Sequence, residues 1–523
     1  MKRSLLFLLL LWPGMGQAQT RYLIDDVADI QIHGARGFDE IGRYPIGSGD
    51  YNGDGIADCI IGTDLSICPE CLKYAHVVFG ATNLPEDIDL YESRLGISER
   101  QVLITGFSFF VPVASLGDFN GDGYDDMFFG DDDADLGELT NAGQAFIKYG
   151  GPSIPHRFDL YDATMEGVRI MGSRFWGWLS AERSIGNAGD INGDGFADAL
   201  LGAPSYASVD PYREAFIIYG GTDVPSELWT HDLGHHGVRI VATDPGETFG
   251  YSMDGVGDVN GDGLNDIVIG SEGAFEEQGY AYLIFGATDL PDQLETEALG
   301  SRGVRIKGAG PGDLFGLNIS AAGDVNRDGF ADFMVSSIGS DPGGKVYLVF
   351  GTPQWPEYLD ADEMGNGGVI IAGSEGLNSV GISAVDVGDA DGDGYDDILV
   401  GARDQRISIK QRQVSIVFGG GNLTNRLRGV LDEYDQLIIE TFTGSDEWFN
   451  ASAVLLGDIN GDGIRDIAIG APFASPYDRG GAGTVYVIYG GKFLPGSADL
   501  NSDGAVNYSD LFLFQSQWMK ESD

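Results

Sequence analysis

Short runs of β-branched and aromatic residues, bounded by glycine, recur along almost the whole chain. A typical unit has four of them: a V-R-I-x-G run (168–172, 238–242 and 304–308), a run that leads into an acidic stretch, a third such as DIVIGS (266–271) and a fourth such as AYLIFGA (281–287). Runs of this length and composition, closed by glycine-rich turns, are typical of antiparallel strands. The pattern therefore predicts a unit of four antiparallel strands.

The acidic stretch inside the unit occurs seven times, at spacings of 65 to 72 residues. Self-similarity at a fixed long period indicates a repeat architecture. Seven four-stranded units predict an all-β fold, a seven-bladed β-propeller of four-stranded antiparallel blades, over residues 19–491. The copies follow G-D-x-N-G-D-G-x-x-D with small departures and lie at 49–58, 117–126, 189–198, 257–266, 323–332, 388–397 and 457–466.

The phase of the repeat predicts how the ring closes. The first run, IQIHG (30–34), matches the V-R-I-x-G run, whereas the last run, VYVIYG (485–490), has no such run after it. Closure removes exposed sheet edges, so we expect residues 30–34 to supply the outer strand of the seventh blade. The linkers with a G-x-x-x-x-P cue, such as 287–294, are predicted to be ordinary surface connections.

The residue types inside the acidic stretch indicate a calcium loop. Positions 1, 3, 5 and 9 carry oxygen side chains, position 7 offers a backbone carbonyl, and glycine at position 6 permits the sharp turn. Oxygen ligands without His or Cys favour Ca²⁺ over zinc or copper. Asp, Asn and Gly also form ordinary turns, but seven copies that all keep these oxygens favour up to seven Ca²⁺ in the propeller. The fifth copy has Arg327 at a position that is not a ligand, so binding should survive there.

The predicted metal ligands of the seven loops are Asp50, Asn52, Asp54, Ile56 and Asp58; Asp118, Asn120, Asp122, Tyr124 and Asp126; Asp190, Asn192, Asp194, Phe196 and Asp198; Asp258, Asn260, Asp262, Leu264 and Asp266; Asp324, Asn326, Asp328, Phe330 and Asp332; Asp389, Asp391, Asp393, Tyr395 and Asp397; and Asp458, Asn460, Asp462, Ile464 and Asp466.

Charge and the N-terminus narrow the functional classes. The net charge is −51, from 81 acidic and 30 basic residues, which excludes nucleic acid as a partner because phosphate contacts need clustered Lys and Arg. An apolar share of 43% argues against a disordered acidic chain. Lys2 and Arg3 precede an apolar run (5–12) and small residues before position 19, which predicts a signal peptide over 1–18 and a secreted or cell-surface protein. No other segment has the roughly 20 apolar residues of a transmembrane span.

Three cysteines lie close together in the first repeat. Cys68 and Cys71 could close a small disulfide loop in an exported protein, and Cys59 falls in a predicted strand. The residues leave the pairing open.

The motifs FG-x-S, GDxNGDGxxD and IGAP over residues 28–491 resemble the FG-GAP repeat of the integrin alpha-subunit propeller. The resemblance implies that the calcium loops join the first and second strands of each blade on a lower face, and that partners bind the opposite, upper face. It predicts an adhesion or recognition module for an extracellular protein or polysaccharide. No G-x-S-x-G, H-E-x-x-H or P-loop motif occurs, so we expect no enzyme and no catalytic residues.

The C-terminal segment 496–523 carries one more candidate calcium loop, followed by an amphipathic pattern. This segment resembles half of a dockerin, which implies either a cohesin-like or a surface partner, and an alternative function as a polysaccharide-degrading enzyme or accessory subunit attached through this tail. Its predicted ligands are Asp499, Asn501, Asp503, Ala505 and Asp510.

The predicted upper-face loops differ most between repeats. They are acidic at 131–140, aromatic at 204–213 and basic at 402–412. Aromatic residues that could offer stacking surfaces are Trp176, Trp178, Tyr206, Tyr212, Phe473 and Tyr477, and a basic patch is formed by Arg403, Arg406, Lys410 and Arg412. His231, His235 and His236 cluster in a linker, where a solvated role is favoured over catalysis.

Overall fold

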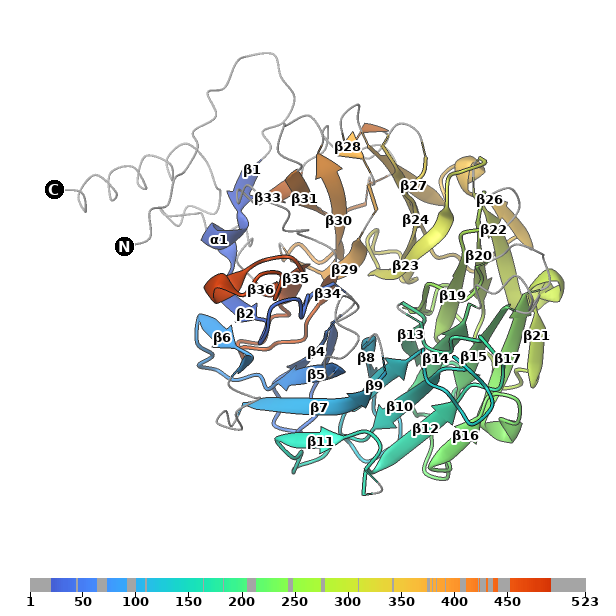
Figure 1. The fold of residues 1–523 in the computed structure, drawn as a ribbon. Helices are drawn as coiled ribbons and strands as arrows, with labels where there is room; N and C mark the ends of the chain where they lie inside the picture. The colour runs from blue at the N-terminus through green and yellow to red at the C-terminus, as the bar shows by residue number, and fades with distance from the viewer. Residues whose placement is uncertain are drawn as a thin grey trace, which may run out of the picture.

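Seven sheets surround a central axis in the computed structural model, with the first strand of each sheet innermost (Figure 1). This arrangement confirms the predicted seven-bladed β-propeller. The structure describes residues 20–490 apart from 44–45, 64–72, 92–99, 109–110, 163, 182, 205–212, 243–247, 274–277, 309, 341–342, 374–376, 379, 382, 391, 405–410, 422, 424–428, 431–435 and 441–451. The predicted signal peptide and the dockerin-like segment lie outside the described residues, as do Cys68 and Cys71.

The strands of each blade are ordered from the central axis to the outer edge of the ring. Blade 1 contains β3 (Gly47–Gly49), β4 (Asp58–Gly62), β5 (Lys73–Val78), β7 (Gln101–Phe107) and β11 (Arg157–Asp159). Blade 2 contains β8 (Val113–Gly117), β9 (Asp126–Asp131), β10 (Gln144–Lys148), β12 (Gly167–Met171) and β16 (Glu227–Trp229). Blade 3 contains β13 (Ile185–Gly189), β14 (Asp198–Ala203), β15 (Arg213–Ile218), β17 (Gly237–Ala242) and β21 (Gln293–Glu295). Blade 4 contains β18 (Met253–Gly257), β19 (Asp266–Ser271), β20 (Tyr280–Ile284), β22 (Gly303–Lys307) and β26 (Tyr358–Asp360).

Blade 5 contains β23 (Phe315–Gly323), β24 (Asp332–Ser337), β25 (Lys345–Val349), β27 (Gly368–Ala372) and β32 (Gly429–Val430). Blade 6 contains β29 (Ala384–Gly388), β30 (Asp397–Asp404), β31 (Gln411–Val417), β33 (Gln436–Glu440) and β1 (Thr20–Leu23), with β28 (Leu377–Asn378) also paired to β30. Blade 7 contains β34 (Ala453–Leu455), β35 (Ile467–Ala471), β36 (Thr484–Ile488), β2 (Ile30–His33) and β6 (Asp87–Asp89). Helical turns occur at α1 (Ile24–Val27), Gly234–His236, Thr296–Ala298, Gly300–Arg302, Ala361–Glu363 and Pro476–Asp478.

The linkers do more than connect the blades. The first four strands of each blade are antiparallel as predicted, but each linker after a third strand also adds a short parallel strand to the preceding blade, as β21 does beside β17. The expectation that these linkers are only surface connections was therefore wrong. The linker crosses the outer edge of the preceding blade, where its backbone satisfies the edge that the outer strand would otherwise expose.

The N-terminal segment closes the ring as predicted. Strand β2 pairs antiparallel with β36, with Ile32 opposite Val485, and so forms the outer strand of blade 7. Strand β1 in turn pairs parallel with β33 at the edge of blade 6. One segment therefore joins two blades at the C-terminal end of the ring.

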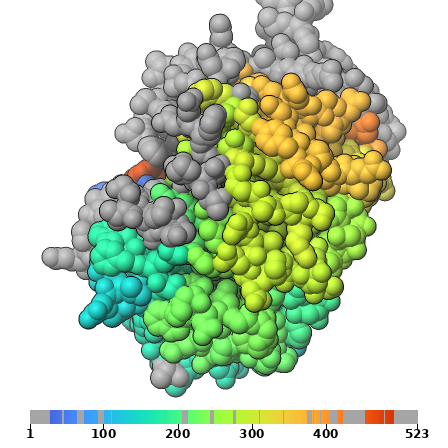
Figure 2. Space-filling view, turned by 90° about the vertical axis from the view of Figure 1, so that its right-hand side faces the viewer, coloured from blue at the N-terminus to red at the C-terminus, as the bar shows by residue number. Residues whose placement is uncertain are grey.

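The hydrophobic core lies between the blades. Among the described residues, seven large clusters of buried side chains each join two neighbouring blades. The cluster with Ile32, Cys59 and Val485 joins blade 7 to blade 1, so it completes the circle. The side view shows blades 2 to 5 packed against one another in chain order (Figure 2). Because middle strands are buried on both faces, a strand such as β19 has every residue buried and reads as a continuous apolar run.

Candidate metal centres and recognition face

The seven acidic loops lie between the first and second strands of their blades, as the resemblance implies. We call this end of the ring the lower face and the opposite end the upper face. The side chain at position 5 is exposed and the Asp at position 9 is buried in every loop, as Asp262 and Asp266 are in the fourth. The other predicted side-chain ligands are half-buried, apart from Asp389, which is exposed, and Asp391, which is outside the described residues.

The carboxylate at position 1 shapes the loop. Asp258 Oδ1 accepts hydrogen bonds from the amides of Gly261 at 2.6 Å and Asp262 at 3.1 Å, and its Oδ2 accepts one from Gly263 at 2.8 Å. Asn260 Oδ1 accepts from the Asp262 amide, and Asp262 Oδ1 accepts from the Leu264 amide. These short-range bonds hold the loop in one curl.

The carboxylate at position 9 joins two segments of its blade. Asp266 Oδ2 accepts from the Val259 amide at 3.0 Å, and its Oδ1 accepts from the Gly286 amide at 2.8 Å, beyond the third strand. All seven loops repeat this pair of bonds, at Asp58, Asp126, Asp198, Asp266, Asp332, Asp397 and Asp466. Burial raises the pKa of Asp266 to about 7, and the two amides lower it only in part. The neighbouring carboxylates of Asp262 and Asp258 raise it further.

Among the described residues, hydrogen bonds join six of the seven pairs of neighbouring loops around the lower face, all but the pair in blades 6 and 7. The amide at position 8 donates to the position-1 carbonyl of the preceding loop, as Asn265 does to Asp190 and Ala331 does to Asp258. The residue that follows the Gly after the third strand donates to the position-2 carbonyl of the preceding loop, as Ala287 does to Ile191. The loop of blade 1 bonds in the same way to that of blade 7, through Ala57 and Asp458. The acidic loops therefore link neighbouring blades on the lower face.

The donor set fits a hard divalent cation. The loops offer carboxylate oxygens, joined in every loop but the sixth by the amide oxygen of an Asn side chain, and these are ligands that Ca²⁺ prefers. A carboxylate oxygen that accepts one amide bond keeps a second lone pair. A cation would offset the mutual repulsion that raises the pKa of Asp266. Within the described residues, no three acidic, His or Cys side chains converge closely enough to form a ready metal cage.

The fifth loop departs from the others at Arg327. Its backbone keeps the positive φ of the glycines that fill this position elsewhere, 56° against 79° at Gly261. In neighbouring loops this glycine leaves room for a position-7 side chain, as Gly261 does for Phe330. Arg327 instead places its guanidinium 5.8 Å from the ring centroid of Tyr395 in the sixth loop. In the fifth loop the Arg327 amide donates to the Asp324 backbone carbonyl at 3.3 Å, and Asn326 Oδ1 has no hydrogen-bond partner in the described structure.

The upper face carries a strained aromatic loop, residues 172–180, between β12 and β13. Trp176, Trp178 and Ser180 all have positive φ, at 56°, 47° and 68°. Phe175 is 51% exposed, and its ring stacks edge-on against Trp176, which meets Trp178 in the same way, with centroids 5.8 and 6.0 Å apart. The sequence pointed to the two tryptophans but not to Phe175, whose exposure depends on the backbone turn.

Two contacts fix this aromatic loop in place. The amides of Trp176 and Trp178 donate to carbonyls at the end of the acidic 131–141 segment, at 2.9 and 3.1 Å. At its base, Arg174 forms a bidentate ion pair with Glu214, at 2.6 and 2.8 Å, on β15 of blade 3. The aromatic cluster, in which Phe175 is exposed and the two tryptophans are half-buried, therefore lies near Glu214 at the junction of blades 2 and 3.

Some of the remaining aromatic, basic and histidine residues singled out from the sequence lie on the surface, and others lie outside the described residues. Tyr206 and Tyr212 lie outside the described residues, as do Arg406 and Lys410 of the basic patch. His231 and His235 are exposed, which agrees with the solvated role expected for them. Tyr477 is exposed on the connection between β35 and β36, and Phe473 is half-buried.

An axial cavity of about 530 Å³ runs between the inner strands. Asp254 and Asp386 face it from blades 4 and 6. Burial raises the pKa of Asp254 to about 7 and that of Asp386 to about 6, and the charge of Asp386 contributes to the shift at Asp254. Sequence reasoning did not single out these acids, because only the ring places inner-strand residues around one axis.

Comparison with known proteins agrees with this architecture. The FG-GAP repeat model matches residues 183–215, 249–284 and 450–488, which are in blades 3, 4 and 7. Integrin alpha-PS2 of Drosophila melanogaster is 29% identical over 242 residues, which is 44% of this chain and 16% of the relative. Integrin alpha pat-2 of Caenorhabditis elegans is 27% identical over 263 residues, 46% of this chain and 18% of the relative.

The chain is an integrin-alpha-like β-propeller. Human integrin alpha-7 is 31% identical over 160 residues, 29% of this chain and 12% of the relative. In each of these three comparisons the integrin-alpha-like propeller aligns with less than a fifth of the relative's length. In the part of the chain that the structure describes, no helix is long and apolar enough to cross a membrane.

Proposed function

We propose that this integrin-alpha-like propeller is a recognition module that binds an extracellular protein or polysaccharide at its upper face. The observation that carries the proposal is the strained aromatic loop, with Phe175 exposed beside Trp176 and Trp178. Non-glycine residues at positive φ each cost on the order of 1 kcal/mol and tend to persist at functional sites. Exposed aromatic residues beside polar groups are typical of binding surfaces.

An array of matrix proteins and polysaccharides tests this proposal. The whole protein, with and without residues 496–523, is applied in calcium, together with a Trp176→Asn variant. Asn tolerates positive φ, so this change removes the indole without adding strain. Binding should weaken at least about tenfold in Trp176→Asn and stay unchanged in Tyr358→Asn, which alters an exposed tyrosine on β26 of blade 4.

Three other outcomes on the array would contradict this assignment. Equal binding by Trp176→Asn would place recognition away from the aromatic loop. Binding that disappears with residues 496–523 would assign recognition to the tail and its cohesin-like or surface partner. Release of reducing or unsaturated sugar ends would indicate the alternative, a polysaccharide-degrading enzyme.

We further propose that the lower loops hold Ca²⁺ in a structural role and that the protein acts outside the cell. Oxygens at positions 1, 3, 5 and 9 would hold the ion; in the fourth loop these belong to Asp258, Asn260, Asp262 and Asp266. Bound Ca²⁺ would supply positive charge to a ring of carboxylates on a chain of net charge −51. Because these loops also join the blades, calcium would stabilise the whole ring rather than one repeat.

Thermal unfolding with and without a chelator tests the calcium proposal. Extracellular calcium modules have dissociation constants of about 10⁻⁴–10⁻³ M, so millimolar calcium contributes roughly 1 kcal/mol per site. Several occupied loops should therefore raise the melting temperature together, and Mg²⁺ at the same concentration should do so far less. An unchanged melting curve in chelator would rule the proposal out.

A further inference from the structure

A cavity of about 610 Å³ opens on the side of the ring where blade 7 meets blade 1. It lies between the short strand β6 and the beginning of β7, and its volume falls within the range of small-molecule sites. We call it the closure pocket. Residues that line it include Leu84, Pro85, Asp87, Arg100, Gln101 and Tyr477.

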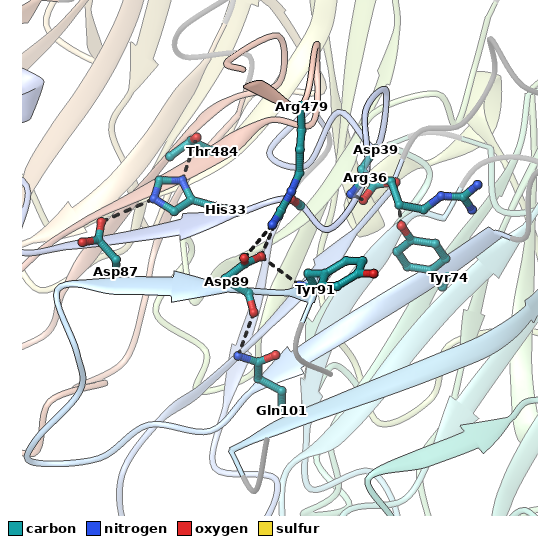
Figure 3. Close-up of polar contacts among 11 residues, drawn as sticks. His33, Arg36, Asp39, Tyr74, Asp87, Asp89, Tyr91, Gln101, Arg479 and Thr484 are labelled. Carbon is teal, nitrogen blue, oxygen red and sulfur yellow. Dashed lines mark hydrogen bonds and ion pairs between the residues drawn. The ribbon is translucent and has the colours of Figure 1, made fainter. Parts of the chain in front are cut away.

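An ion pair with Arg479 holds Asp89, a residue that lines the closure pocket (Figure 3). Arg479 Nη1 and Nη2 donate to the two carboxylate oxygens of Asp89 at 2.6 and 2.7 Å, and Nη1 also donates to the Gly34 carbonyl at 2.8 Å. Burial raises the pKa of Asp89, but hydrogen bonds from Arg479 and the Tyr91 amide outweigh it and hold the pKa below its usual value. Bidentate pairs of this kind fix orientation as well as charge. The charges of this pair are thus already matched.

A neutral histidine orients the second carboxylate. Burial lowers the pKa of His33, so the imidazole is uncharged near pH 7. Its Nδ1 lies 3.2 Å from Thr484 Oγ1 and its Nε2 lies 3.4 Å from Asp87 Oδ1. With its proton on Nε2, His33 donates to Asp87 and accepts from Thr484. The Asp87 side chain is 63% exposed, so this carboxylate still has room to accept hydrogen bonds from a ligand.

Gln101 supplies a buried acceptor without a partner. The residue is 4% exposed, its Nε2 reaches the Asp89 carbonyl only at 3.5 Å, and its Oε1 has no hydrogen-bond partner in the described structure. A buried unsatisfied polar atom costs about 1–3 kcal/mol. A ligand that brings a hydroxyl or amide proton to this oxygen would recover that cost.

Tyr477 places an aromatic ring at the rim. The residue is 57% exposed, its ring lies edge-on to His33 with centroids 5.1 Å apart, and its backbone has a φ of 52°. The Arg479 guanidinium lies 5.1 Å from the Tyr477 centroid and 5.3 Å from that of Tyr91. Leu84 and Pro85 add apolar wall. The closure pocket therefore combines an aromatic ring, apolar contacts and acceptors for hydroxyl groups.

We propose that the closure pocket binds one or two rings of an uncharged saccharide. Neighbouring hydroxyls of a sugar can donate to Gln101 Oε1 and to Asp87, while its C–H face contacts Tyr477 and the apolar wall. An anion would meet the carboxylates of Asp87 and Asp89, and a cation would meet Arg100. This site is separate from the aromatic loop on the upper face and does not depend on the function proposed there.

Titration calorimetry of the full chain tests the closure pocket with a panel of glucose, galactose, mannose, N-acetylglucosamine, maltose and lactose. At least one sugar should bind. Gln101→Met keeps the side-chain volume and removes the acceptor, and Tyr477→Asn removes the ring while tolerating the positive φ. Each variant should weaken binding at least about tenfold, whereas Tyr358→Asn should leave it unchanged. If Gln101→Met does not fold, as judged by its unfolding curve, Tyr477→Asn at the exposed rim decides.

The remaining outcomes overturn the proposal. No binding by any sugar in the panel, or unchanged binding in both pocket variants, would do so. Sugar binding that is lost in Trp176→Asn and kept in the pocket variants would move the site to the upper face. Saturable binding of lysine amide or of citrate, with no sugar bound, would show a charged ligand instead.

Discussion

The two faces of the propeller are built from the same strands but follow different rules. On the lower face, all seven acidic loops repeat the pair of bonds made by the position-9 Asp, and backbone hydrogen bonds join six of the seven pairs of neighbouring loops in the described structure. On the upper face, neighbouring connections differ in length, charge and aromatic content, and the one at 172–180 holds strained residues. The difference indicates that the lower face stabilises the ring, while the upper face is free to vary for recognition.

The largest effect should come from the position-9 carboxylate. Asp266→Ala leaves the buried amides of Val259 and Gly286 without an acceptor, which should lower the free energy of unfolding by about 2–4 kcal/mol even in chelator. Asp262→Ala, at the exposed position 5 of the same loop, should have little effect in chelator and reduce only the gain from calcium. Denaturant unfolding of both variants with and without calcium separates the two roles. If both variants lost the same free energy of unfolding in chelator, the separate roles assigned to positions 9 and 5 would be wrong.

A substitution in the aromatic loop of the upper face should reduce ligand binding without a loss of stability. Trp176→Gly removes an indole from a backbone held at a φ of 56°, so stability should stay the same or rise by up to about 1 kcal/mol. Affinity for an upper-face ligand should fall at the same time. Paired unfolding and binding measurements check this, and a large loss of stability would show that the aromatic loop belongs to the core.

A pH-dependent effect on stability is expected between the two faces, at Asp254. Its folded pKa of about 7 lies above the usual value for Asp, so the folded protein binds this proton more tightly than the unfolded chain does. Its contribution to stability is therefore largest near pH 4 and is lost as the pH rises to about 7. Asp254→Asn should match the parent at pH 4 and exceed it at pH 8, in constant calcium. A difference that does not change with pH would contradict this assignment.

The smallest effect should come from Arg327, where the lower face departs from its own pattern. Arg327→Gly relieves a positive φ but removes the contact with Tyr395, which is worth about 0.5–1 kcal/mol at an exposed site. We expect a net gain of no more than about 0.5 kcal/mol and unchanged calcium affinity. Unfolding curves and calcium titration measure both, and a loss above about 1 kcal/mol would show that the side chain supports the link between neighbouring blades.

Much of the architecture was predictable because it depends on local and periodic features. The repeat count gave the number of blades, and the match of residues 30–34 to the V-R-I-x-G run gave the outer strand of blade 7. The loop positions followed from the acidic motif. The fifth, parallel strand of each blade was not predicted, because a three-residue run such as Gln293–Glu295 has no periodicity until a neighbouring edge pairs with it.

The sequence by itself determined the units, since strand-length apolar runs, turn glycines and clustered oxygens act over a few residues. The tertiary structure decided which residues of different units come into contact. The ion pair between Arg479 and Asp89 joins residues 390 positions apart. The axial acids and the closure pocket likewise exist only once the ring closes. Ring closure brings distant side chains together through backbone pairing and inter-blade packing, and no local pattern in the chain records which of them will meet.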